Sequence, residues 1–139
     1  MDLVKIDGVV YDVLVAALQE KSQIVEGKNS GTSLHREREI RDLIGIKYAH
    51  SITFAPNDEA PELFDALFSY LFDNVRESVM LEVVHGQKTI AYEAAYSTGA
   101  RTVDYISNIK DGEEETEFIG WGDLTVEFRS IEAVISAEV

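Results

Sequence analysis

The chain has 139 residues, which is enough for a single domain over residues 1–139 that buries a core without disulfides or metal ions. It contains no cysteine, and this excludes disulfide scaffolds, thiolate zinc sites and cysteine nucleophiles. Its 12 basic and 26 acidic residues give a formal charge of −14, so phosphate backbones would be repelled and we expect no nucleic-acid binding.

No stretch of the sequence approaches the ~20 apolar residues of a membrane helix. The first residues, Met1 to Lys5, lack the basic start and long apolar run of a signal peptide. We therefore expect no membrane association and synthesis in the cytoplasm.

The N-terminal part of the chain predicts two strands. Val9 to Leu18 contains β-branched residues at alternate positions and is expected to be a strand, although Ala16 to Glu20 could instead be helical. Ile44 to Phe54 alternates apolar and polar residues and predicts a long second strand.

Between these strands lies a long loop, residues 27–39, with two glycines, few apolar residues and clustered basic side chains. Loops of this length in a compact domain are usually disordered or functional, so we expect a partner. Because acidic residues dominate elsewhere, this loop can dock on an acidic surface of a second copy. The alternative is a solvated loop with local ion pairs. The predicted inter-subunit residues are Lys28, Asn29, His35, Arg36, Arg38 and Arg41.

A helix is predicted from about Ala60 to about Asn74, with Asp58 as its cap and Pro61 in its first turn. Its apolar residues recur at spacings of three and four, so one face should pack on a sheet. These residues are Leu63, Phe64, Leu67, Phe68, Leu71 and Val75.

After the helix, Val79–His85 and Lys88–Ser97 are expected to form a hairpin around Gly86-Gln87, a type II′ turn that would pair His85 with Lys88. A second turn at Thr98-Gly99 predicts a third strand, roughly Arg101 to Ile109, pairing Ala94 with Val103 and Tyr92 with Tyr105.

The acidic run Asp111 to Glu117 is predicted to be a polar loop, and Leu124 to Arg129 alternates as a last strand. The run has the charge of a calcium loop but not its spacing, because the glycine comes second. We prefer a solvated loop.

Candidate chemistry is sparse in this sequence. His35, Glu37 and Glu39 could present metal ligands on one side of an extended chain, but no second histidine is near, so we predict no metal site. His50 and His85 lie in strands without an evident acid or nucleophile and could simply be half-buried and hydrogen-bonded. Trp121, between two glycines, can cover a sheet edge or lie at an interface, and a place in the single core is an equally good interpretation. Without an activating partner for any carboxylate, we rank a hydrolase or isomerase last and predict no catalytic residue and no cofactor.

Two strands around a long loop, one helix and a strand meander resemble the tail-tube-like fold of long-tailed phages, shared by tail tube, distal tail and type VI secretion tube proteins. Three segments look like small tail and baseplate proteins of prophages in Gram-positive bacteria: GTSLHR (31–36), YSTGAR (96–101) and GWGDLTV (120–126). The resemblance implies a homo-oligomeric ring, commonly of six subunits, in which the loop contacts a neighbouring subunit or ring. It also implies other tail proteins as partners and synthesis in a bacterial host followed by incorporation into the virion.

The fold class we predict is α+β, mainly β: an antiparallel β-sandwich or half-barrel with one flanking helix at 60–74 and a long loop at 27–39. The predicted function is that of a structural subunit of a phage tail, tube or baseplate that assembles with itself. The alternative is a small acidic ligand- or calcium-binding protein without catalysis.

Overall fold

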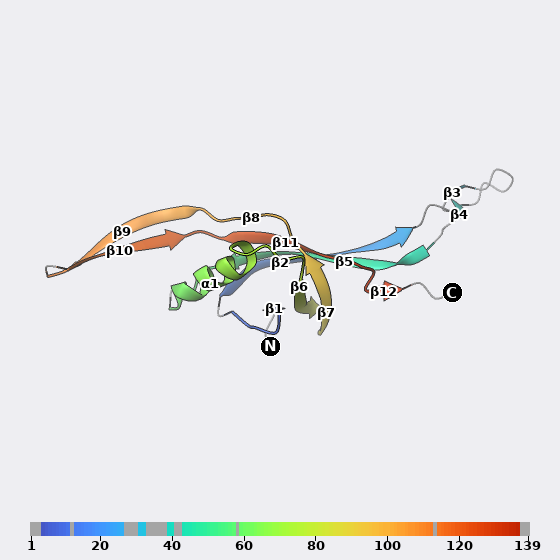
Figure 1. The fold of residues 1–139 in the computed structure, drawn as a ribbon, viewed down its shortest axis with the longest axis horizontal. Coiled ribbons are helices and arrows are strands. Elements are labelled where there is room, and N and C mark those ends of the chain that lie inside the picture. The colour runs from blue at the N-terminus through green and yellow to red at the C-terminus, as the bar shows by residue number, and fades with distance from the viewer. Residues whose placement is uncertain are drawn as a thin grey trace.

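The computed structural model describes residues 4–11, 13–26, 31–32, 39–40, 43–57, 59–112 and 114–136. Within these ranges the chain is mainly β with one helix, which confirms the predicted fold class (Figure 1). The elements are β1 (Val4–Ile6), β2 (Leu14–Glu26), β3 (Gly31–Thr32), β4 (Glu39–Ile40), β5 (Leu43–Ala55), α1 (Pro61–Phe72), β6 (Val79–His85), β7 (Lys88–Ala95), β8 (Gly99–Ala100), β9 (Val103–Asp111), β10 (Glu114–Trp121), β11 (Leu124–Ser130) and β12 (Ile135–Ser136).

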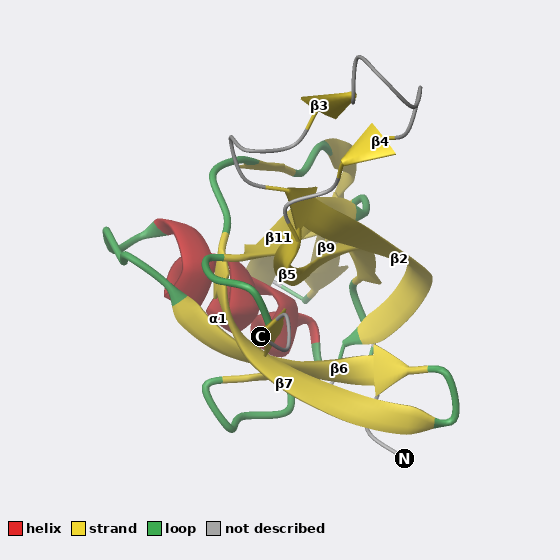
Figure 2. Ribbon diagram, turned by 90° about the vertical axis from the view of Figure 1, so that its right-hand side faces the viewer, coloured by secondary structure: helices red, strands yellow, loops and turns green. Residues whose placement is uncertain are grey.

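One antiparallel sheet organises the molecule, in the order β1-β6-β7-β11-β5. β8 takes the place of β7 beside the first half of β11, and β12 continues along the edge of β5 that β11 leaves. β2 pairs with the opposite edge of β5 over almost the whole length of both strands. The sheet curls around its buried face, as Figure 2 shows.

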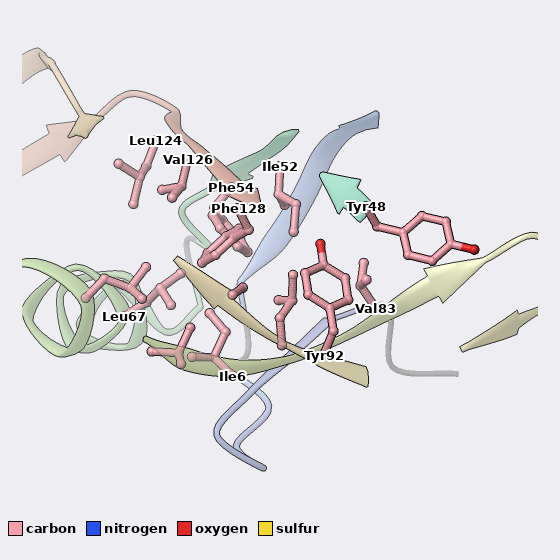
Figure 3. Packing of buried hydrophobic residues seen from close by; sticks show 14 of the residues in the cluster. Ile6, Tyr48, Ile52, Phe54, Leu67, Val83, Tyr92, Leu124, Val126 and Phe128 are labelled. Carbon is pink, nitrogen blue, oxygen red and sulfur yellow. The ribbon is translucent and has the colours of Figure 1, made fainter. Parts of the chain in front are cut away.

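Apolar alternation explains why β5 and β11 lie at the centre of this sheet. All even-numbered residues of β11 from Leu124 to Ser130 are buried while the odd-numbered ones are exposed. In β5 the even-numbered residues from Tyr48 to Phe54 are buried as well, and the odd-numbered ones between them are half-buried. Their buried faces share one core with residues from β1, β6, β7 and α1 (Figure 3). The two strands predicted at 44–54 and 124–129 are confirmed.

α1 closes one end of the core. Phe64, Leu67 and Leu71, at spacings of three and four, are its buried residues, as the periodicity predicted. Pro61 occupies the first turn, where its missing N–H costs nothing. The predicted Asp58 cap lies outside the described residues, and the helix begins after Ala60 without a side-chain cap. The helix ends at Phe72, so Val75 is fully exposed, and its predicted place on the buried stripe is wrong.

The hairpin of β6 and β7 has the predicted register, with His85 opposite Lys88, Val83 opposite Ile90 and Leu81 opposite Tyr92. Gly86 has a φ of 63°, which suits the first position of a type II′ turn. Here the turn residue and the apolar alternation of both strands indicate the same pairing, and the prediction is confirmed.

The predicted third strand of the meander is wrong in its partner. β7 pairs with β11, joining Ala94 to Ser130 and Ala95 to Arg129, and β9 leaves the main sheet. After β7 the chain enters β8 at Gly99. A Cβ atom at this position would lie 2.3 Å from the ring of Phe72, so only glycine fits without a shift of that ring. β8 then pairs with the first half of β11 instead of turning back onto β7.

β9 and β10 form a two-stranded ribbon that projects from the body at the end opposite β3 and β4 (Figure 1). The acidic run predicted as a loop is largely strand, since Glu114 pairs with Asp111 and Glu117 with Asn108. A ribbon with solvent on both faces needs no apolar alternation, which explains the wrong prediction.

The N-terminal strand also differs from its prediction. β2 begins at Leu14 and reaches Glu26, and the helical alternative for Ala16 to Glu20 is wrong because Ala17 to Glu20 pair with β5. A turn precedes it, in which Asp7 and Gly8 both have positive φ angles. The Asp7 carboxylate accepts hydrogen bonds from the Met80 amide (2.6 Å) and from the Tyr70 hydroxyl, and so ties β1 to β6 and α1.

Candidate inter-subunit interface

β2 presents a long open strand edge. Its inner edge pairs with β5, and among the described residues no strand pairs with its outer edge. Most of its 13 residues are exposed, including the apolar Leu14 and Ile24. A long unpaired edge is a template for pairing with another chain. β2 is therefore the clearest candidate for contact with a second polypeptide.

The middle of β2 is fastened to the body by one carboxylate. Glu20 Oε2 lies 3.2 Å from Nε2 of His50 in β5, and Glu20 Oε1 lies 2.7 Å from Nδ1 of His85 at the end of β6. His50 is completely buried, and its Nδ1 lies 2.6 Å from the hydroxyl of Tyr92 in β7. Four strands thus meet in one hydrogen-bonded cluster, and both histidines have the acid partner that the sequence did not reveal.

Burial sets the proton affinity inside this cluster. It lowers the pKa of His50 below the ordinary value, although the hydrogen bond and charge of Glu20 act in the opposite direction. Burial likewise raises the pKa of Tyr92. A neutral His50 satisfies both neighbours, since Tyr92 donates to Nδ1 and Nε2–H donates to Glu20. The arrangement is that of a structural network rather than of an activated nucleophile.

A second feature is a cleft of about 530 Å³ between the start of α1 and β10. Its walls are aromatic and acidic: Phe64, Glu62 and Asp65 from α1, and Glu117, Phe118 and Trp121 from β10, with Tyr105 of β9 beside them. The ribbon that forms one wall exposes Val103, Tyr105, Ile106 and Ile119 to solvent. Isolated two-stranded ribbons are marginally stable in water, so this one gains from a partner.

Arg101, which does not itself line the cleft, connects two residues that do, Asp65 and Trp121. Its guanidinium lies 4.1 Å from the ring centres of both Phe68 and Trp121, and it donates a hydrogen bond of 2.7 Å to Asp65. Of the three places predicted for Trp121, the structure supports the core: the ring is partly buried, packs against the hydrophobic core and stacks on Arg101. This contact links α1 to β10.

The residues predicted to contact a neighbouring subunit all lie outside the described residues: Lys28, Asn29, His35, Arg36, Arg38 and Arg41. The candidate ligands His35 and Glu37 lie there too. What the structure shows of this region is its base, where Gly31 pairs with Ile40 and Thr32 with Glu39. The predicted contact therefore stays a prediction.

In the described part of the chain, no three histidine or acidic side chains come together as a metal site would require. Among the same residues, no helix has the length and apolar character needed to cross a membrane. Most side chains of the acidic run considered for calcium, Asp111 to Glu117, lie outside the described ones, so that alternative stays a prediction.

Comparison with known proteins gives one informative result. No family model matches the sequence, and no curated protein matches it. A similar fold, however, occurs in a solved virion structure. A chain of the "Virion of native gene transfer agent (GTA) particle" is similar with a TM-score of 0.50 and 13% identity, over 98% of this chain and 95% of that one. At this identity the likeness is one of fold, and it extends over nearly the full length of both chains.

Proposed function

We propose that this chain is a non-catalytic structural subunit of a phage-like particle, which assembles with copies of itself into a closed ring and resides in the virion once assembled. Six copies is the number that the tail-tube resemblance implies, and tube, baseplate and tail-completion components are the roles it offers. Other virion proteins would then be its partners.

The open edge of β2 carries this proposal. Thirteen residues long and mostly exposed, it is far more edge than a solitary protein usually leaves uncovered. Ring closure between identical copies covers such an edge in every subunit at once, because each copy offers one surface and receives another. The shared fold with a virion chain supports the same assignment.

The basic loop supplies the second contact of the proposal. Residues 28–41 hold four of the 12 lysines and arginines of the chain, in a protein whose net charge is −14. Opposite charges on two copies orient the encounter and exclude wrong pairings more than they add affinity. β3 and β4, the described residues within this region, lie beyond the end of β2 and β5 (Figure 1), which supports an outward contact.

A deletion tests the proposal. Removal of residues 28–38 should leave the subunit folded, with a Tm within a few degrees of the parent, because the deletion removes the short β3–β4 pairing but no residue of the main sheet or of α1. The parent chain should form discrete oligomers as its concentration rises, and the deletion variant should remain a monomer. Mass by multi-angle light scattering over a range of concentrations measures both. A parent that stays monomeric throughout, or a variant that assembles normally, contradicts the proposal.

A further inference from the structure

The geometry points to the cleft between α1 and β10 as the docking site for the basic segment 28–41 of a second copy. This inference rests on the proposed self-assembly and adds to it the receiving surface, which the sequence did not identify.

Every charged side chain that lines the cleft is acidic. Glu62 and Asp65 stand on the first turns of α1, and Glu117 faces them from β10. Asp65 is already paired with Arg101, whereas Glu62 and Glu117 have no ion-pair partner in the part of the chain that the structure describes. Two unpaired carboxylates on facing walls form a site for a cation that comes from outside the subunit.

The aromatic side chains make the cleft suited to arginine in particular. Phe64, Phe118, Tyr105 and Trp121 line it, and the planar guanidinium of arginine stacks on such rings while it pairs with carboxylates. Arg101 of the same subunit already makes such a contact, because it stacks on Trp121 and pairs with Asp65. The subunit therefore contains a built example of the contact that we infer for its neighbour.

Charge complementarity identifies the occupant. Residues 28–41 contain four lysines and arginines against two glutamates, a net charge of +2 with His35 neutral, in a chain that is otherwise strongly acidic. Three of these cations are arginines, which is the side chain the cleft fits. No stretch of this length that lies wholly outside residues 28–47 holds more than two lysines and arginines.

The placement of the two surfaces makes the contact intermolecular. Segment 28–41 leaves and re-enters the body through the paired ends of β2 and β5, while α1 and the β9–β10 ribbon lie toward the opposite end (Figure 1). Contact between surfaces at opposite ends joins copies head to tail, and such a contact repeats from one copy to the next until it closes a ring or extends a filament. The exposed Tyr105 and Ile119 beside the cleft would be covered in the same step.

Trp121 provides a direct readout, because it is the only tryptophan of the chain and lines the cleft. A capped peptide of residues 28–41, added to the full chain, should change the Trp121 emission saturably, and high salt should weaken the effect. The double variant Glu62→Gln with Glu117→Gln should raise the peptide Kd at least about tenfold. Glu77→Gln with Glu132→Gln, an equal charge change at exposed positions outside the cleft, should leave the Kd unchanged.

A second measurement applies if the isolated peptide binds the cleft with too low an affinity to be detected. The chain has no cysteine, so single cysteines can be placed in two separately tagged copies. Glu117→Cys and Arg36→Cys should give a disulfide-linked heterodimer on oxidation, and Glu132→Cys with Arg36→Cys should not. A chain that self-associates while neither the peptide nor the crosslink reports on the cleft overturns this inference and leaves the proposed function standing. A chain that never self-associates instead overturns the proposed function, whatever the peptide does.

Discussion

His50 carries a polar side chain into the centre of an apolar core, and it is tolerated there because both ring nitrogens are satisfied. Tyr92 supplies a hydrogen at one nitrogen and Glu20 accepts one at the other. Buried polar groups without such partners cost about 1–3 kcal/mol each. The cluster therefore ties β2, an otherwise exposed strand, to β5 and β7 at a specific register.

The same burial makes folding sensitive to pH. The pKa of His50 is lowered in the folded protein, chiefly by burial, so between the folded and unfolded pKa values the unfolded chain holds the extra proton. The contribution of His50 to stability is then complete above the unfolded pKa of about 6.5 and is lost as the pH falls below it. We expect the Tm to fall between pH 8 and pH 5.

The variant His50→Gln isolates this contribution. Glutamine offers a donor and an acceptor without a titrating ring, so the Tm of the variant should fall less steeply over the same pH range, even though its absolute value is lower. His85 and Glu20 remain in both proteins, so the comparison changes only the side chain at position 50. Parallel Tm profiles for the two proteins would contradict this assignment.

At the scale of elements, α1 is held to the sheet by more than its apolar face. The Tyr96 hydroxyl donates to the backbone carbonyl of Leu71 at 2.6 Å near one end of the helix, and Arg101 binds Asp65 and the ring of Phe68 nearer the other. The side chain of Arg101 is 15% exposed and that of Asp65 is 59% exposed. Packing and ring contact should therefore matter more here than the ion pair, which solvent screens.

This difference predicts unequal costs for the two partners. Arg101→Ala removes the stacked guanidinium from Phe68 and Trp121 and should lower the free energy of unfolding by about 2 kcal/mol. Asp65→Asn keeps that stacking and should cost less than about 0.5 kcal/mol. Urea unfolding, followed by Trp121 fluorescence, measures both. Equal losses in the two variants would show that the ion pair, rather than the rings, holds α1.

Elements with local signals were predictable, and those defined by distant partners were not. The register of β6 and β7 follows from Gly86 and two alternating patterns that adjoin it. The partner of β7 could not be found in this way. The predicted partner of Ala94, Val103, is a better apolar match than its observed partner Ser130, so the sequence pattern favours the wrong strand. Acidic residues hid β10 for a related reason, since a ribbon open to solvent imposes no periodicity on its residues.

The same limit applies to the candidate site. The basic cluster could be recognised because its residues are neighbours in sequence, and its role in assembly stays a prediction. His50 and His85 lie 30 and 65 residues from Glu20 in the sequence. The pairing of β2 with β5 sets Glu20 opposite His50, and neither that pairing nor the contact with His85 has a local signal in the sequence. The cleft likewise combines residues of α1 with Glu117 and Trp121, from a strand that was predicted in part as a loop.

At the scale of the whole molecule, the exposed edge of β2 should decide between a solitary and an assembled protein. Ile24 lies on this strand opposite Ile46, and its side chain is 51% exposed. A lysine on an edge strand opposes pairing with another strand because pairing would desolvate its charge. Ile24→Lys should therefore raise the concentration needed for assembly at least about tenfold, while the Tm of the monomer changes by no more than a few degrees.

Val75→Lys introduces a lysine at a fully exposed position after α1 and should leave assembly as it is. Sedimentation velocity over a concentration series separates the two variants. Identical association of Ile24→Lys and the parent chain would remove β2 from the interface and, with it, the observation on which the proposed ring depends.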